Sequence, residues 1–477
     1  MFRHFSFKFR LAGLCLLLVL VLTSWLFQSG QSAHAKGAWI MLSPNAGLPT
    51  STVKVKGTQF GSQETVSLSF DSTPVGNATT SSKGAFSTTI TIPQAARTGF
   101  HKVTARGQSS GLVASARFQV LAVDWPTFGF DTNHSHFNPY ENQLNSSNVS
   151  NLAKAWSFLG TSNFYIAPAV VDGVVYATDT ISLYAIDAAT GTRLWKTSGI
   201  NGYQSSPAVA NGVVYISEAT NNLVAIDAAT GAKLWTYDVG RFLSASPVVA
   251  NGLVYIGSFG DEEPFDAIDA VTGKTRWTYP MSSVFSSPAV ANGIVYVADG
   301  NGIVYALDAA NGSERWTFQA QQNIASSPTV VNGVVYIGSD DGNVYALDAA
   351  TGAKLWSYQT GGDVKSSPAV ANGIVYISSD QLYALDVATG SKLWSFPVAY
   401  NYGADTTPVV ANGVVYVSSD RLYALNATNG TQLWNYALGG EASPVVVNGT
   451  VYIGGSNSHN HHEYALRLPT TVPAVHP

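Results

Sequence analysis

The residues with the clearest metal-binding chemistry lie in one short stretch near the C-terminus, residues 456–464. It contains His459, His461, His462 and Glu463, and imidazoles combined with a carboxylate can bind zinc or copper. Their spacing is too tight for a structural zinc site, whose ligands come as two separated pairs. A polar loop in water explains this composition without a metal, so we predict none. The acidic stretch at 261–265 is an equally weak indication of a calcium site.

An aspartate recurs along the chain, and each time a tryptophan follows it eight residues later, as in DAATGAKLW at 348–356. So many catalytic copies would be redundant, whereas Asp can accept N–H bonds across a turn that ends in Gly. We therefore predict that this Asp caps a turn and that the Trp packs between neighbouring units. These structural residues are Asp187, Asp227, Asp269, Asp308, Asp348 and Asp386, with Trp156, Trp195, Trp235, Trp277, Trp316, Trp356, Trp394 and Trp434.

Binding chemistry is expected where the repeated units differ, in the stretches that precede a recurring proline. These stretches combine aromatic with charged side chains, a combination that suits a ligand or partner site. The alternative is that they pack at the rim of the fold without a ligand. The candidate binding residues are the aromatic Phe164, Tyr203, Phe242, Tyr400 and Tyr402 and the charged Arg241, Lys365, Asp405 and Glu441.

The elements that must position these residues repeat about every 40 residues, because eight prolines from Pro168 to Pro444 follow at gaps of 39, 40, 41, 40, 40, 40 and 36. One unit, residues 366–396, contains four short apolar segments. An Asn-Gly hairpin, a variable loop and a Thr-Gly turn separate them. The two middle segments are nearly continuous apolar runs, as in strands buried on both faces. This period predicts a β-propeller of four-stranded antiparallel blades.

The ends of the repeat predict how the ring closes. Trp156 has no proline strand before it, and Pro444 has no tryptophan after it. Residues 151–158 are therefore expected to supply the fourth strand of the last blade, which gives eight blades over residues 151–468 and leaves no free edge. The Asn-Gly and Thr-Gly turns would then share one face of the ring, and the variable loops the other.

The pattern A-x-D-x-x-T-G-x-x-x-W resembles the tryptophan-docking motif of PQQ-like repeat proteins, over residues 124–468. Such propellers occur in quinoprotein dehydrogenases and in the barrel-assembly scaffold lipoprotein of Gram-negative outer membranes. Residues 125–144 also resemble the lead-in of these propellers. Asn426 and Arg467 stand where other units have Asp, and we expect their turns to be less well capped.

The resemblance is compatible with catalysis and with binding. PQQ-dependent alcohol dehydrogenases carry adjacent cysteines beside the quinone, and some carry a C-x-x-C-H haem motif, but this chain has neither. We also find no match to their Glu, Asn and Asp calcium ligands. We therefore expect no cofactor, and PQQ with calcium only if the chain is a dehydrogenase.

Residues 36–122 alternate apolar and polar residues at a period of two, with Gly, Ser and Asn between the runs. This predicts an Ig-like β-sandwich, and the segment resembles bacterial Ig-like or IPT-like modules, which are usually spacers or adhesive units. Residues 123–150 would be a linker or lead-in, and residues 469–477 a C-terminal tail.

The N-terminus is typical of a secretory signal over residues 1–35, with Arg3, Lys8 and Arg10 before an apolar run and an A-x-A site ending at Ala35. An uncleaved membrane anchor is the alternative. Cys15 is the only cysteine, so the mature chain has no disulfide and depends on a large core. The net charge of −5 and the absence of a basic stripe argue against a nucleic-acid partner.

These features together predict an exported, monomeric, two-domain all-β protein, secreted or otherwise extracytoplasmic. Its function is predicted to be non-catalytic binding or scaffolding through the variable-loop face. The partner would be an envelope or cell-surface protein or polymer, and membrane contact would need the uncleaved anchor. The alternatives are a PQQ-dependent dehydrogenase without adjacent cysteines and a surface adhesive protein that uses the Ig-like module.

Overall fold

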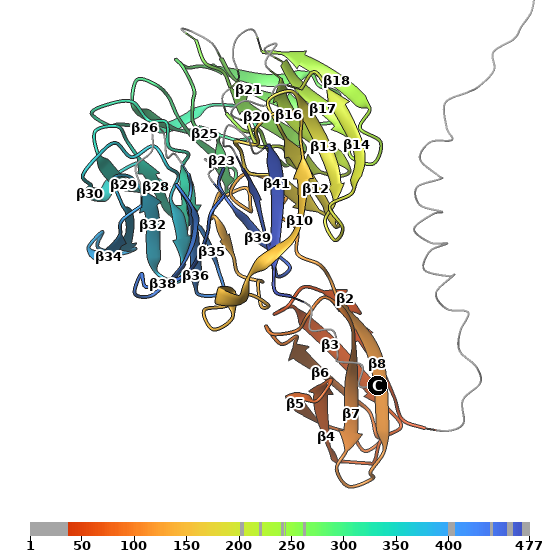
Figure 1. Ribbon diagram of the computed structural model, residues 1–477. Coiled ribbons are helices and arrows are strands. Elements are labelled where there is room, and N and C mark those ends of the chain that lie inside the picture. The colour runs from red at the N-terminus through yellow and green to blue at the C-terminus, as the bar shows by residue number, and fades with distance from the viewer. Residues whose placement is uncertain are drawn as a thin grey trace, which may run out of the picture. The chain divides into compact units, whose positions relative to one another are not determined.

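The computed structural model describes residues 37–200, 205–218, 222–239, 243, 245–260, 264–398, 406–438, 442–455 and 461–469. The described chain is all-β apart from one 3-10 turn, η1, at Val149–Asn151. It divides into two compact units (Figure 1). The first covers 37–93 and 99–120, and the second covers 94–98 and the residues from 121 onward. None of the described residues forms a helix long and apolar enough to cross a membrane.

The first unit is the expected β-sandwich. One sheet contains β1 (Trp39–Ser43), β3 (Thr52–Thr58) and β6 (Phe86–Thr91). The other has the order β2 (Ala46–Gly47), β8 (Val113–Val120), β7 (Gly99–Gly107), β4 (Thr65–Phe70) and β5 (Thr73–Thr79). Alternate residues such as Val53, Leu68 and Phe118 are buried between the sheets, as the period of two predicts.

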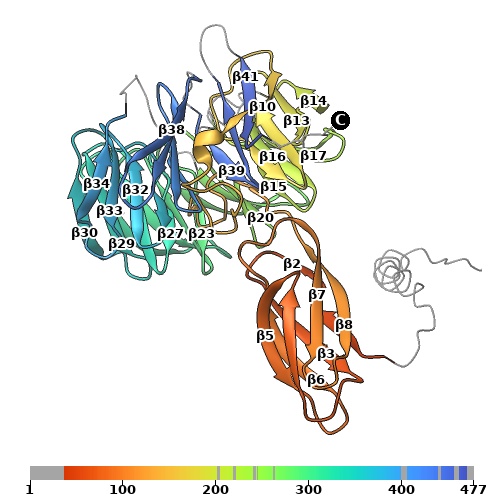
Figure 2. The ribbon, with the colours of Figure 1, turned by 60° about the horizontal axis from the view of Figure 1, so that its bottom comes forward.

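The second unit is the predicted ring of eight four-stranded antiparallel sheets, visible in Figures 1 and 2. Blades one to four are β11 (Ala169–Val171), β12 (Val174–Thr178), β13 (Ser182–Asp187) and β14 (Arg193–Ser198); β15 (Ala208–Ala210), β16 (Val213–Glu218), β17 (Asn222–Asp227) and β18 (Lys233–Asp238); β19 (Val248–Ala250), β20 (Leu253–Gly257), β21 (Pro264–Asp269) and β22 (Thr275–Pro280); β23 (Ala289–Ala291), β24 (Ile294–Ala298), β25 (Ile303–Asp308) and β26 (Glu314–Gln319).

Blades five to eight complete the ring. They are β27 (Thr329–Val331), β28 (Val334–Gly338), β29 (Asn343–Asp348) and β30 (Lys354–Gln359); β31 (Ala369–Ala371), β32 (Ile374–Ser378), β33 (Leu382–Asp386) and β34 (Lys392–Phe396); β35 (Val409–Ala411), β36 (Val414–Ser418), β37 (Leu422–Asn426) and β38 (Gln432–Tyr436); and β39 (Val445–Val447), β40 (Thr450–Gly454), β41 (His462–Arg467) and β10 (Ala153–Leu159).

The last blade closes as predicted. β10 pairs antiparallel with β41, with Ala153 opposite Arg467 and Leu159 opposite His462. The fourth strand of this blade therefore comes from the segment before blade one. Arg467 therefore pairs with Ala153 of the closing strand, and the described residues after it, 468 and 469, form no turn that would need an Asp cap.

The recurring tryptophan holds each blade to the next. The Trp316 indole N–H donates to the Ala349 carbonyl of the following blade at 3.0 Å. The same bond recurs at 2.9–3.2 Å from Trp156, Trp195, Trp235, Trp277, Trp356 and Trp394. The indole ring of Trp316 also packs against Gly352 in the turn of the next blade. A Cβ on Gly352 would come within 2.6 Å of this indole. Trp434 instead stacks on Tyr436, beside η1.

The recurring Asp caps the turn between the third and fourth strands of its blade, as predicted. Oδ1 of Asp348 accepts the Thr351 N–H at 2.8 Å and the Ala350 N–H at 3.1 Å. The Asn426 turn is less well capped, as expected, because its amide oxygen accepts two N–H bonds at 2.9 and 3.2 Å and no hydroxyl, whereas Asp348 also accepts the Thr351 hydroxyl at 2.8 Å. An amide oxygen accepts these bonds as a carboxylate does, so the turn tolerates the change.

Residues 123–138 are not a linker: they run along the inner strands of the propeller. The first strands of neighbouring blades pack against one another and so surround the axis. Their central valines donate backbone N–H bonds to carbonyls of this segment, at 2.7–3.0 Å. The donors are Val170, Val209, Val290, Val330, Val370 and Val410. β9 (Phe137–Asn138) pairs with β35, and the Asn138 side chain donates to Val446. The segment thereby satisfies the inner edges.

A belt of hydroxyl groups links the inner strands just before the prolines. The backbone N–H of Ser287 donates to Oγ of Ser327 in the next blade at 2.9 Å. Equivalent bonds run from Ser206 to Ser246, Ser246 to Ser287, Ser327 to Ser367, Ser367 to Thr407 and Thr407 to Ser443. The first blade has Ala167 at this position, so the belt has no acceptor hydroxyl there.

We predict that the tryptophan contact makes the turn glycine more sensitive than a glycine of equal backbone conformation. Gly352 and Gly333 of the same blade have φ of 73° and 79°, but only Gly352 faces a side chain. Gly352→Ala should therefore cost about 1–3 kcal/mol more in unfolding free energy than Gly333→Ala. Urea denaturation of both variants measures the difference. Equal losses would show that the strain lies in the backbone alone.

One ionisable residue stands in the core of the closing blade. Glu463 is fully buried in β41, and neither carboxylate oxygen has a hydrogen-bond partner among the described residues. Burial raises its pKa well above the usual range. The other blades have an apolar, fully buried residue at this position: Leu183, Leu223, Phe265, Val304, Val344, Leu382 and Leu422.

Glu463→Leu should stabilise the propeller near neutral pH by about 1–3 kcal/mol, because a buried polar group without a partner is removed. The folded state holds the Glu463 proton more tightly than the unfolded chain does. Wild-type stability therefore falls as pH rises above the unfolded pKa of about 4.3. The increase in unfolding free energy caused by Glu463→Leu, measured by urea denaturation, should be larger at about pH 7.5 than at about pH 4.5. A variant that is less stable at both values would show that Glu463 has a stabilising partner.

Candidate binding face

The two ends of the blades differ in how their connections are held. At one end, which we call the uniform face, the Asn-Gly hairpin and the Asp-capped turn of each blade are tied together. In blade five the Ala349 N–H donates to the Gly333 carbonyl at 2.9 Å, and the same bond recurs in the first seven blades. This face is thus repetitive and its backbone groups are satisfied internally, which leaves little variation for recognition.

At the other end, which we call the variable face, the connections between second and third strands carry a recurring tyrosine–aspartate pair. The Tyr345 hydroxyl donates to Asp341 at 2.7 Å, and the Tyr383 hydroxyl to Asp380 at 2.8 Å. Pairs Tyr184–Asp179, Tyr305–Asp299 and Tyr423–Asp420 repeat this contact at 2.8–3.0 Å. Burial and the Asp380 carboxylate raise the pKa of Tyr383 to about 12, so its hydroxyl remains a donor.

These pairs were not foreseen from the sequence, although a signal exists. An aspartate precedes the third-strand tyrosine by three to six residues in those five blades. The bond needs the loop to fold back over its own strand, a feature that residue spacing alone does not reveal. Each pair fixes a loop and at the same time places a carboxylate at the variable face.

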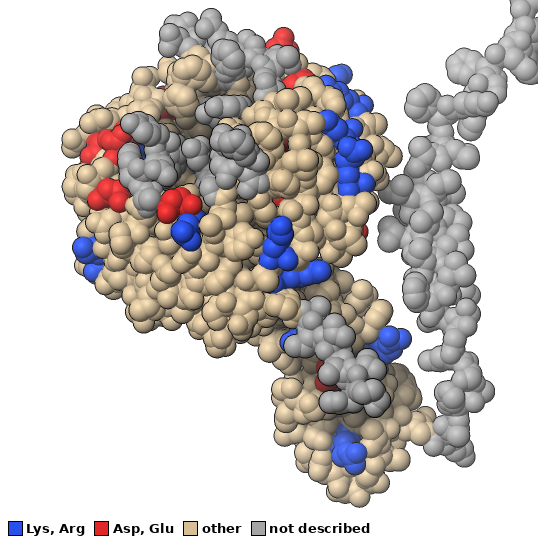
Figure 3. Space-filling view, viewed as in Figure 1, with Lys and Arg blue, Asp and Glu red and all other residues tan. Residues whose placement is uncertain are grey.

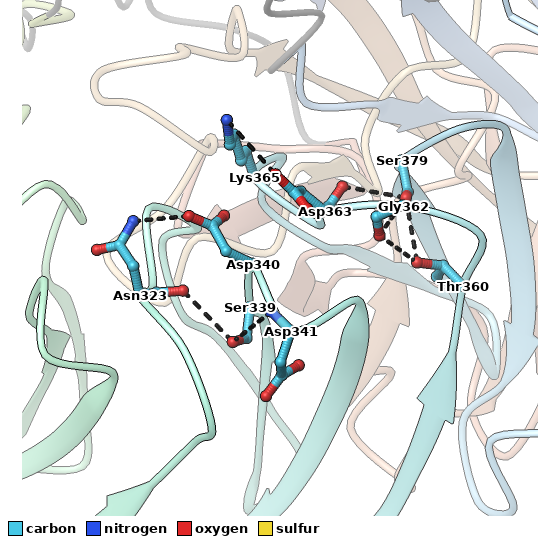
Figure 4. Close-up of polar contacts among 9 residues, drawn as sticks. All are labelled: Asn323, Ser339, Asp340, Asp341, Thr360, Gly362, Asp363, Lys365 and Ser379. Carbon is cyan, nitrogen blue, oxygen red and sulfur yellow. Dashed lines mark hydrogen bonds and ion pairs between the residues drawn. The ribbon is translucent and has the colours of Figure 1, made fainter.

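Blades five and six hold the best-defined polar cluster of this face (Figure 4). Hydroxyls fix its backbone: Ser379 Oγ donates to the Gly362 carbonyl at 2.9 Å and to the Asp363 carbonyl at 3.0 Å. The Asp363 side chain is about half exposed and lies 3.9 Å from the Lys365 ammonium, which is 38% exposed. These two side chains therefore stand on a rigid backbone and remain accessible.

A second pair in the cluster has unused acceptors. Asn323 Nδ2 donates to Asp340 Oδ2 at 2.8 Å. Asn323 Oδ1 and Asp340 Oδ1 are shielded from solvent and have no hydrogen-bond partner among the described residues. Buried acceptors without donors are costly.

The described connections of the variable face are strongly acidic. Seven carboxylates lie in them: Asp179, Asp299, Asp340, Asp341, Asp363, Asp380 and Asp420. Only two Lys or Arg side chains, Lys365 and Arg421, lie in the same described connections. Figure 3 shows acidic side chains gathered over the part of the propeller where β26 and β30 lie. The face therefore favours a basic partner.

The structure tests two of the nine predicted binding residues. Phe164 is not at the rim: it is fully buried and packs on Phe158 and Tyr184, because it fills the space beside Gly454 in the closing blade. Lys365 lies on the variable face as expected. The remaining seven, Tyr203, Arg241, Phe242, Tyr400, Tyr402, Asp405 and Glu441, lie outside the described residues.

The histidine-rich stretch divides between loop and strand. His461 Nδ1 pairs with the Asn163 amide oxygen, and Glu463 points into the core instead of into a loop. His459 lies outside the described residues, as do residues 261–263 of the acidic stretch. Within the described ranges, no group of three or more His, Cys, Asp or Glu is placed to hold a metal ion.

The described residues also do not fit PQQ with calcium. Residues 123–138 occupy the inner side of the blades, and His134 and His136 are buried there with ring nitrogens that lack partners among the described residues. Burial lowers the pKa of His134 to about 3, so this site offers neutral imidazoles instead of cations for an anionic quinone. The sequence supplies no adjacent cysteines.

Eight blades, seven of which dock a tryptophan on the next, define a PQQ-like repeat propeller, and comparison with known proteins agrees. Residues 179–284 and 266–462 match the family model described as outer membrane protein assembly factor BamB. These spans cover more than half of the chain, so the chain belongs to this family of repeat propellers. Residues 125–201 match a glucose/ethanol/alcohol dehydrogenase propeller model, and residues 35–120 a macroglobulin-like domain.

Similarity to curated and solved proteins is more limited. A quinohemoprotein alcohol dehydrogenase of Comamonas testosteroni is 38% identical over 74 residues, which are 15% of this chain and 10% of that enzyme. The chain thus matches only about a tenth of the length of this relative. The crystal structure of that species' enzyme superposes with a TM-score of 0.63 at 18% identity, over 72% of this chain and 80% of that one.

BamB from Moraxella catarrhalis superposes with a TM-score of 0.56 at 21% identity, over 67% of this chain and 98% of that one. Both superpositions establish the propeller fold. Neither identity is high enough to carry an activity across.

Proposed function

We propose that this chain is an exported binding or scaffolding protein whose propeller holds a basic protein partner on the variable face. The observation that carries the proposal is the cluster of blades five and six. There, the Asp363 side chain is about half exposed, and the described connections of this face hold seven carboxylates against two Lys or Arg side chains. Lys or Arg side chains of a partner would supply the opposite charge.

Three further features support binding over catalysis. The family model that matches most of the chain is described as an assembly factor. The described inner surface suits neither PQQ nor calcium. The uniform face satisfies its own backbone, whereas the variable face differs from blade to blade. Export rests on the secretory signal expected at residues 1–35, which lie outside the described residues.

The proposal is tested by removing two carboxylates from one face at a time. Asp340→Asn with Asp363→Asn should weaken partner binding about tenfold or more, because two charge-assisted contacts are lost. The matched control is Asp172→Asn with Glu314→Gln, an equal change of charge away from the cluster. Asn is the residue that the other seven blades have at the position of Asp172.

The measurement is quantitative affinity capture from the envelope and medium fractions of the source cells, with melting temperatures confirming that both variants fold. A partner retained by the control and lost by the Asp340 and Asp363 variant is the expected result. A partner lost only with the control would place the binding surface elsewhere and contradict the proposal.

The dehydrogenase alternative, favoured by the 74-residue identity to a quinohemoprotein enzyme, predicts a different outcome. Titration of the intact chain with PQQ and calcium should show no saturable binding if the inner surface is filled as described. Saturable binding at about micromolar PQQ, accompanied by a rise in melting temperature, would favour the dehydrogenase instead.

A further inference from the structure

The whole-chain charge conceals two segments of opposite sign. Residues 37–120 contain seven Lys or Arg and two Asp or Glu. Residues 121–477 contain 13 Lys or Arg and 27 Asp or Glu. The sandwich is thus basic, although the chain as a whole is acidic. The net charge of −5 therefore conceals the basic character of the sandwich.

Both acidic residues of the sandwich are engaged in loops. Glu64 accepts the Ser109 and Ser110 N–H groups at 3.0 and 2.7 Å and the Ser110 hydroxyl at 2.6 Å. Asp71 lies 2.7 Å from His101 Nδ1 and accepts the Lys102 N–H at 2.9 Å. Among the described residues, neither Glu64 nor Asp71 forms an ion pair with Lys102, Arg106 or Arg117.

Three of these cations share the outer face of the five-stranded sheet. Register places Lys102 of β7 directly opposite Arg117 of β8, and Arg106 opposite Val113. The five strands of this sheet contain no Asp or Glu. Like charges directly opposite each other destabilise a sheet. An anion bound between Lys102 and Arg117 would remove this repulsion.

An exposed aromatic ring and neutral polar groups complete the face. Phe100 is 62% exposed, and the Arg117 guanidinium lies 4.3 Å from its ring centroid. Phe100, Lys102 and Arg117 line a shallow hollow of about 380 Å³, together with Asp71, whose carboxylate is paired with His101. Thr104 pairs with Ser115 between the cations. The face therefore offers an apolar ring, hydroxyls and unpaired cations side by side.

We propose that this face binds an acidic polysaccharide, a chain of sugar rings that carry carboxylates. Phe100 would contact the apolar C–H face of a sugar ring. Lys102 and Arg117 would bind its carboxylate, and the Ser and Thr hydroxyls would pair with sugar hydroxyls. Lys102 and Arg106 are four residues apart on one strand, about 14 Å, so a linear polymer with repeated charges can reach both. A nucleic acid would need several stacking rings, and this face offers one.

The test uses the intact chain and polygalacturonate oligomers, with binding measured by calorimetry. Lys102→Gln with Arg117→Gln should weaken binding about tenfold or more. The matched control is Lys54→Gln with Lys56→Gln, which removes the same charge from β3 in the opposite sheet. Phe100→Ser should also weaken binding, and wild-type affinity should fall as salt rises.

Two further probes distinguish an acidic polysaccharide from an uncharged polysaccharide and from a nucleic acid. Methyl-esterified polygalacturonate has the same sugars without charge and should bind about tenfold more weakly or not at all. Single-stranded oligothymidylate of equal charge should bind more weakly than polygalacturonate. The proposal is overturned if the wild type does not bind polygalacturonate, if both double variants lose affinity equally, or if the oligothymidylate binds more tightly. Because the propeller variants of the preceding section leave this face intact, failure here leaves the proposed function untouched.

Discussion

The docking of one tryptophan on the next blade's turn is the contact on which the propeller depends. The indole N–H satisfies a turn carbonyl, and its ring covers a glycine whose left-handed φ and missing Cβ make the approach possible. The Asp cap holds that turn in the shape the indole needs. Seven of the eight blades are thereby fixed to the next by one side chain and one turn, and the closing strand β10 carries Trp156, which joins the last blade to the first.

The segment before the first blade has a structural task that follows from the same geometry. In an antiparallel blade the first strand presents an edge to the axis, and its N–H groups need acceptors. Residues 123–138 supply them from the inside, and the hydroxyl belt links the same strands before their prolines. The described inner strands thus have backbone N–H groups satisfied within the chain.

The two surfaces that we propose to bind partners carry opposite charge. The variable face of the propeller is acidic and rigid where blades five and six meet, since hydroxyls hold its backbone. The five-stranded sheet of the sandwich has cations and no carboxylate. A protein with an acidic surface on one unit and a basic surface on the other suits a role in holding partners, because each surface selects the opposite charge.

The sequence by itself determined the number of blades, the strand that closes the ring and the roles of Asp and Trp. These depend on spacing and on short-range turn chemistry, which repeat in a readable pattern. Only the tertiary structure decided that residues 123–138 line the inner strands, that Phe164 and Glu463 are buried, and that Lys102 faces Arg117. Those outcomes depend on contacts between residues far apart in the chain or on strand register, and no local pattern fixes them.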